Sequence, residues 1–209
     1  MAMQTVREAA KEARREAIFA AAEALIRRTG HTDFSMRDLA QEAGLSLATA
    51  YNLIGSKSTV LYALLNRRAD ALAEPGVAPK AGVAMRDHLG NSARRAVRQF
   101  TGDPEFFRPL MRFLLSVPDP VHRPAFMARG LAYWRGVMQP LESAGRLPDG
   151  MRASDFASVV HLVFTGALDM WIHEEYSARR FQQELDKCLA LLMLAIRKDG
   201  NARPGRSAD

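Results

Sequence analysis

Apolar residues recur at every third or fourth position along most of this chain, and this helical spacing constrains its fold more than any other feature. No stretch alternates apolar and polar residues for long enough to predict a strand. Glycine and proline interrupt the pattern, as they do between helices, mainly at residues 74–79, 102–104, 117–120 and 147–150. The sequence therefore predicts an all-α protein.

The expected helices fall into two groups. Residues 7–29 and three shorter segments, capped by Ser35, Ser46 and Ser56, form an N-terminal group. Longer helices are expected near residues 83–100, 104–116, 124–144, 154–176 and 178–198. We expect a first domain at residues 1–72 and a second at residues 73–198. Residues 199–209 are expected to be a disordered tail, because they contain almost no apolar side chains.

Two short helices between residues 35 and 54 form the most informative motif. Ser35 and Asp38 have the spacing of a capping box, with Asp38 in place of the usual Glu or Gln. Gly44 can adopt the positive φ that a tight turn needs, and Ser46 caps the next helix. This arrangement is typical of the helix-turn-helix, whose second helix lies in the major groove of DNA.

The second of these helices has an unusual outer surface. Ala50 and Ile54 face the core, whereas the outward positions offer hydroxyls, an amide and small apolar groups instead of Lys and Glu. Such groups suit phosphates, adenine edges and thymine methyls. The alternative is a small helical hairpin that only packs. The outward residues are Leu47, Ala48, Thr49, Tyr51, Asn52 and Leu53.

Residues 10–72 resemble the N-terminal domain of the tetracycline-repressor (TetR/AcrR) family of bacterial transcriptional regulators. Ile54 stands where that family usually has Phe, and Leu53 where it often has His, Asn or Tyr. The second half of the chain matches the family only in length and helical layout. The matching pieces are Ser35-Met36-Arg37-Asp38-Leu39-Ala40, Ala43-Gly44-Leu45-Ser46, Thr49-Ala50-Tyr51 and Gly55-Ser56-Lys57.

The resemblance implies a role for each matching residue in DNA binding. Lys57, Tyr51 and Thr49 would contact phosphate, and Arg37 would reach a phosphate or a base. The resemblance also implies that Leu47, Ala48 and Asn52, on the helix that Ser46 caps, are the base readers. An Asn–adenine pair contributes about 1–3 kcal/mol of discrimination between bases.

The last two expected helices are apolar on more than one face, which requires burial on more than one side. A second subunit would supply that cover, and the resemblance implies a homodimer joined through residues 154–176 and 178–198. The alternative is the core of a monomer. The additional apolar positions are Leu162, Gly166 and Met170 on the first helix and Leu191, Leu194 and Ala195 on the second.

The resemblance also implies that the second domain binds a small effector. Met and aromatic side chains can line adaptable apolar cavities, although for each one alone core packing is the better interpretation. Two polar residues, His161 and Asp169, lie on an otherwise apolar helix and would either orient a ligand or bond to neighbours. The apolar candidates are Phe107, Met111, Leu114, Trp134 and Met138.

Charge, apolar run length and cysteine content limit which partners and which cellular compartment we expect for this protein. The net charge is +6, divided as +2 in residues 1–80 and +4 in residues 81–209, so charge alone is weak evidence for DNA binding. No apolar run approaches the roughly 18 residues of a membrane span. The N-terminus lacks the pattern of a secretory signal. The single cysteine, Cys188, fits a reducing cytosol, so we expect a cytoplasmic protein without a membrane partner.

The sequence predicts no enzyme, metal site or cofactor. The five histidines lack metal-ligand spacing, and Cys188 has no cysteine partner. Gly44-Leu45-Ser46-Leu47-Ala48 only superficially matches a nucleophile elbow, since a helix and not a strand is expected before it. No glycine-rich phosphate loop is present.

These observations predict a DNA-binding transcriptional regulator. The expected form is a repressor that a small apolar or amphipathic effector releases from an inverted-repeat operator. Two alternatives stay open at this point. One is a ligand-binding or scaffolding helical dimer without DNA binding, and the other is an enzyme built on a helical bundle.

Overall fold

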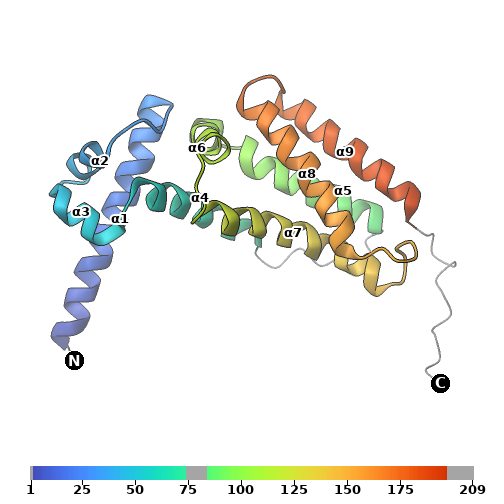
Figure 1. Ribbon diagram of the computed structural model, residues 1–209, viewed down its shortest axis with the longest axis horizontal. Coiled ribbons are helices and arrows are strands. Elements are labelled where there is room, and N and C mark those ends of the chain that lie inside the picture. Colours follow the sequence, from blue (N-terminus) through green and yellow to red (C-terminus); the bar gives the residue numbers. More distant parts are fainter. Residues whose placement is uncertain (1, 74–83, 197–209) are drawn as a thin grey trace. The chain divides into compact units, whose positions relative to one another are not determined.

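The computed structural model describes residues 2–73 and 84–196, and all the regular structure in these residues is helical (Figure 1). The all-α prediction is confirmed. The expected interruption at residues 74–79 and the tail at residues 199–209 lie outside the described residues. The helices are α1 (Ala2–Thr29), α2 (Met36–Glu42), α3 (Leu47–Ile54), α4 (Lys57–Ala73), α5 (Met85–Thr101), α6 (Pro104–Ser116), α7 (Arg123–Ser143), α8 (Ala153–Ile172) and α9 (Ala178–Ala195).

Two helix ends differ clearly from the sequence-based expectation. Helix α1 begins at Ala2, five residues before the expected start at Arg7. Helix α8 ends at Ile172, four residues before the expected end at Tyr176, because Glu174 adopts a positive φ of 66°. The backbone N–H groups of Glu175 and Tyr176 then both donate to the carbonyl oxygen of Met170, at 2.9 and 3.0 Å, and this closes the helix.

The chain divides into two compact units. The first combines residues up to Asp70 with Asp103–Phe126, and the second combines α5, α8 and α9 with α7 from Met127 onward. Sequence reasoning placed one boundary near residue 72 and did not anticipate that α6 joins the first unit. The functions expected for residues 1–72 and 73–198 remain predictions.

A polar and aromatic cluster holds α6 in the first unit. Arg27 of α1 donates to both carboxylate oxygens of Asp103, at 2.9 and 2.7 Å. The guanidinium groups of Arg27 and Arg68 lie 5.3 and 5.0 Å from the ring centroid of Phe106. Because Arg68 of α4 also pairs with Glu23 of α1 at 3.1 Å, the cluster joins α1, α4 and α6.

Apolar side chains from the remaining helices complete the core of the first unit. Helix α1 contributes an apolar stripe at helical spacing, α2 and α3 pack against it, and α4 adds buried leucines to the core. The fully or nearly fully buried members are Ile18, Ala22, Ile26, Leu39, Ala40, Ala50, Val60, Leu61 and Leu65.

Aromatic rings form the centre of the second unit. Phe164 of α8 lies 5.7 Å from Trp134, 5.6 Å from Phe100 and 5.2 Å from Phe181, measured between ring centroids. Helix α9 packs against both α8 and α5. Tyr133 donates its hydroxyl to the carbonyl oxygen of Ser92 at 2.8 Å, which ties α7 to α5.

Helix α8 qualifies one expectation from the sequence. In the part of the chain that is described, it is the one helix long and apolar enough to cross a membrane by length and composition. Its buried residues, among them Phe156, Val160 and Leu168, belong to the core of the second unit. Core helices commonly pass the same test, so the result is weak evidence for a span.

Candidate nucleic-acid interface

The start of α2 is fixed by the predicted capping box. The backbone N–H of Ser35 donates to the Asp38 carboxylate at 2.8 Å, and the N–H of Asp38 donates to the Ser35 hydroxyl at 3.2 Å. Bonds from the backbone and side chain of Ser35 hold the pKa of the Asp38 carboxyl below its ordinary value. Met36, Leu39 and Ala40 then face the core.

The turn between α2 and α3 has the geometry that the sequence predicts. Gly44 has a φ of +66°, and the N–H of Leu45 donates to the carbonyl oxygen of Ala40 at 2.9 Å. The Ser46 hydroxyl accepts a hydrogen bond from the N–H of Thr49 at 3.1 Å and so caps α3. These local bonds determine the angle at which α3 leaves the turn.

Helix α3 buries one side and exposes the other. Ala50 is 0% exposed and Ile54 is 7% exposed, so these two residues anchor the helix. Ala48, Tyr51 and Asn52 are exposed, and Leu47, Thr49 and Leu53 are half-buried. Because this outer face carries no charged side chain, it presents a hydroxyl, a phenol, an amide and methyl groups.

Lys57 makes a contact that sequence reasoning did not anticipate. Its ammonium group donates to the carbonyl oxygen of Thr32 at 2.9 Å and lies 5.7 Å from the ring centroid of Phe34. An ammonium group has three N–H donors, so two remain for a further acceptor. Arg37, on the first turn of α2, is exposed. The DNA contacts expected from Lys57, Arg37 and the α3 residues remain predictions.

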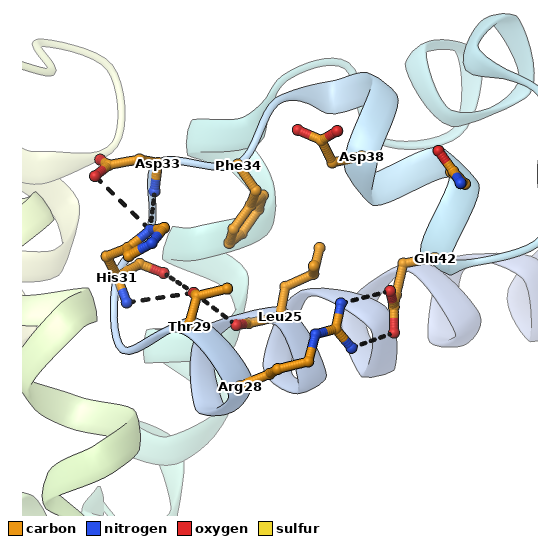
Figure 2. Close-up of a pocket in the computed structure, with 9 residues that line it drawn as sticks. Leu25, Arg28, Thr29, His31, Asp33, Phe34, Asp38 and Glu42 are labelled. Carbon is orange, nitrogen blue, oxygen red and sulfur yellow. Dashed lines mark hydrogen bonds and ion pairs between the residues drawn. The ribbon is translucent and has the colours of Figure 1, made fainter.

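A shallow pocket lies at the end of α1, between α1 and α2 (Figure 2). Arg28 and Glu42 form a bidentate pair across it, at 3.0 and 2.8 Å. The ring Nδ1 of His31 accepts from the N–H of Asp33 at 3.2 Å, and the Thr29 hydroxyl donates to the carbonyl oxygen of Leu25. Since these polar groups bond to one another, we interpret the pocket as part of the packing between α1 and α2 and not as a binding site.

The residues expected to bind an effector divide between the two units. Phe107, Met111 and Leu114 are buried on α6 in the first unit, and Trp134 and Met138 are buried on α7 in the second. Burial is compatible with either alternative that the sequence leaves open, cavity lining or core packing. Their role in binding therefore stays a prediction.

The two polar candidates of α8 have different surroundings. His161 packs against Gly130 of α7, and its Nδ1 atom is buried without a hydrogen-bond partner. This burial lowers the pKa of the His161 ring. The Asp169 carboxylate is 46% exposed and lies 3.5 Å from Nδ1 of His173. His161 therefore retains an unused polar atom, whereas Asp169 has a partner at the surface.

Sequence reasoning did not anticipate that the charged residues of α1 divide into an acidic side and a basic side. Residues Glu12, Glu16 and Glu23 lie on one side of α1, and the Glu16 carboxylate pairs with Arg67 of α4 at 2.8 Å. On the α2 side, Arg28 pairs with Glu42. The seven-residue spacing of Arg7, Arg14, Ala21 and Arg28 was the available signal.

Solved structures share this fold over nearly the whole chain. SmeT, the repressor of the SmeDEF multidrug efflux pump of Stenotrophomonas maltophilia, superposes with a TM-score of 0.67 at 20% identity, over 93% of this chain and 96% of that one. FadR of Thermus thermophilus, a TetR-family transcriptional repressor in complex with lauroyl-CoA, has a TM-score of 0.68 at 23% identity, over 91% and 99%.

NalD, the secondary repressor of the MexAB-OprM multidrug efflux pump in Pseudomonas aeruginosa, has a TM-score of 0.62 at 18% identity, over 90% of this chain and 98% of that one. SmeT is also known in a complex with triclosan. No protein-family model and no curated protein sequence matches this chain. The chain therefore has the fold of TetR-family transcriptional regulators, in its second half as well as in residues 10–72.

Proposed function

We propose that this protein is a DNA-binding transcriptional regulator, a repressor that a small apolar or amphipathic effector releases from an inverted-repeat operator. The observation that carries the proposal is the outer face of α3. Ser46 and Gly44 hold this helix at the surface, and it exposes Ala48, Tyr51 and Asn52 without a charged side chain. A surface helix that binds no DNA would normally carry Lys or Glu at these positions.

The proposed repressor is a homodimer that forms through α8 and α9. These neighbouring helices expose five large apolar side chains. A protein that works as a monomer rarely leaves such a patch in contact with water. A two-fold interface would bury the same patch on both copies and match an inverted-repeat site. The side chains are Val159 (45% exposed), Leu162 (71%), Met170 (37%), Leu191 (69%) and Leu194 (84%).

Regulation in this proposal is a shift between two forms of the dimer. In one form, the two α3 helices are separated by about 34–36 Å and enter successive major grooves. An effector that binds the other form more tightly weakens DNA binding by its difference in affinity for the two forms. This role needs no enzymatic step and places the protein in the cytoplasm, with the DNA.

An apolar or amphipathic effector suits the second unit. Trp134 and Met138 are buried there with Phe164, and the nearby helix α8 offers the unpaired Nδ1 of His161 as one polar contact. Two proteins with the same fold bind ligands of this class, lauroyl-CoA in one and triclosan in the other. We propose that His161 makes a hydrogen bond to the effector.

Selection of duplexes from a random pool tests the proposal. Enrichment of an inverted repeat, followed by release of the protein from that duplex by a fatty acyl thioester or a chlorinated phenol, would support it. Enrichment of asymmetric single sites only, or of no sequence at all, would contradict the regulatory role. A duplex that no apolar compound releases would contradict the effector part alone.

A further inference from the structure

The N-terminal half of α1 extends beyond the rest of the first unit. Figure 1 shows this part of the helix continuing past α2 and α3. Residues 6–14 are all exposed, and Ile18 is the first fully buried residue of the helix. The exposed turns therefore add nothing to the core, and their surface is available to a partner.

Charged residues on this extension are sorted by side. Seven residues advance an α-helix by almost two full turns, so residues seven apart lie nearly above one another. Arg7 and Arg14 continue the row of Ala21 and Arg28, and Lys11 continues the row of Ile18 and Leu25. We call Arg7, Lys11 and Arg14 the basic row.

Contacts further along α1 show which way each side of the helix faces. Arg28 pairs with Glu42 of α2, so the basic row lies on the side of α1 that faces α2 and α3. Glu16 pairs with Arg67, and Glu23 pairs with Arg68, so the acidic side faces α4. The basic row has no hydrogen bond or ion pair with any residue that the structure describes.

We infer that the basic row binds the phosphates of the DNA that flanks the base pairs read by α3; this inference rests on the proposed function. Helix α3 packs its inner face toward α1 and exposes the opposite face. A duplex held by α3 therefore lies on the same side of α1 as the basic row. Three exposed cations without partners match a polyanion on that side.

The geometry sets the reach of this contact. Arg14 and Arg7 precede Ile18 by four and eleven residues, which places them about 6 and 16 Å along the helix axis from the first buried turn. At 3.4 Å per base pair, this span corresponds to roughly five base pairs. The basic row would thus lengthen the DNA contact without reading its sequence.

An anionic membrane would also attract three cations, but the extension lacks the other half of a membrane-binding helix. Interfacial helices place large apolar side chains such as Trp, Phe or Leu opposite their basic face. Between residues 6 and 17 the only apolar side chains are Val6 and alanines. The observations therefore favour DNA.

The test compares two triple variants of the full chain. The first replaces the basic row (Arg7→Gln, Lys11→Gln, Arg14→Gln), and glutamine keeps the helix propensity of Arg and Lys. The matched control removes the same charge from exposed arginines of the second unit (Arg86→Gln, Arg135→Gln, Arg179→Gln). Binding is measured at several salt concentrations on the selected duplex and on random duplex, and also on phosphatidylglycerol vesicles.

Each lost phosphate contact should reduce the slope of log affinity against log salt by about 0.9, and so by up to about 2.7 per protomer for the basic-row variant. The control should keep the slope of the unaltered protein on both duplexes. Equal slopes for the two variants would overturn the inference, as would loss of vesicle binding with an unchanged DNA slope. Absence of any preference for the selected duplex would overturn the proposed function, while the slope on random duplex would still decide the role of the basic row.

Discussion

Lys57 donates a hydrogen bond from its ammonium group to the carbonyl oxygen of Thr32, across 2.9 Å. The two residues lie 25 positions apart, and the bond ties the first turn of α4 to the loop between α1 and α2. Thr32 is only 7% exposed, so its carbonyl has little access to water. The same side chain can therefore support the helix-turn-helix and hold a phosphate with its remaining donors.

Replacement of Lys57 by alanine should affect both stability and DNA binding. Loss of the bond to Thr32 should lower the free energy of unfolding by about 1–2 kcal/mol, which urea denaturation would measure. The salt slope should flatten by about one unit, with an equal loss of affinity for every duplex. Lys187→Ala, at an exposed lysine of α9, is the control for loss of a lysine. A changed base preference would contradict the phosphate role.

Replacement of Asn52 by alanine should relax base discrimination at one position in each half-site, by about 1–3 kcal/mol. The salt slope should stay the same, because no phosphate contact is removed. Affinities for a set of duplexes with single base changes would measure the effect. Gln41→Ala removes an exposed amide from α2 and should change no preference. An Asn52→Ala protein with the original preferences would remove Asn52 from the base readers.

Replacement of Gly44 by alanine should destabilise the first unit through its backbone. A Cβ atom at this position meets nothing within 4 Å, so the cost comes from the φ of +66°. This conformation costs an alanine about 1–2 kcal/mol, which urea denaturation would detect. Gly90→Ala in α5, where only the flexible Arg94 side chain is near, should instead be neutral or stabilising. An unchanged free energy of unfolding for Gly44→Ala would show that the turn relaxes.

The local features of the site could be predicted from the sequence because neighbours create them. The bonds of Ser35 with Asp38 and of Ser46 with Thr49 span three residues each, and Pro104 marks the start of α6. The pairing of Arg27 with Asp103 joins residues 76 positions apart, so no local pattern reveals that α6 belongs with α1. The contact between Lys57 and Thr32 was hidden for the same reason.

Stability should depend on pH through His161. Burial lowers the pKa of its ring from the ordinary value of 6.5, so the folded state binds the proton less tightly than the unfolded state does. The contribution of the neutral His161 ring to the free energy of unfolding is complete above about pH 6.5. It is lost as the pH falls through the lower pKa that the ring has in the folded state. Urea denaturation between pH 5 and 8 should show a smaller loss on acidification for His161→Gln. If the free energy of unfolding of the two proteins depended on pH in the same way, the result would contradict a buried, neutral His161 ring.

Introducing negative charge into the exposed apolar patch of α8 and α9 should dissociate the proposed dimer into monomers. Leu162→Glu with Leu194→Glu places carboxylates at side chains that are 71% and 84% exposed, so the free energy of unfolding of a single subunit should change little. Sedimentation velocity should show monomers, and affinity for an inverted repeat should fall. Val121→Glu, at an apolar side chain that is 75% exposed in the first unit, is the control. If the double variant stays dimeric, the dimer interface lies elsewhere on the protein.

The central claim is that two copies of α3 enter successive major grooves, and directed DNA cleavage tests it most directly. Cys188 is the single cysteine, so a Cys188→Ser chain with Ala48→Cys carries one thiol, on the outer face of α3, for an iron chelate that cleaves nearby DNA. We predict two clusters of cuts on the selected duplex, related by two-fold symmetry and separated by about 10 base pairs or a multiple of that spacing. Cuts that are absent, scattered or confined to one cluster would contradict the claim.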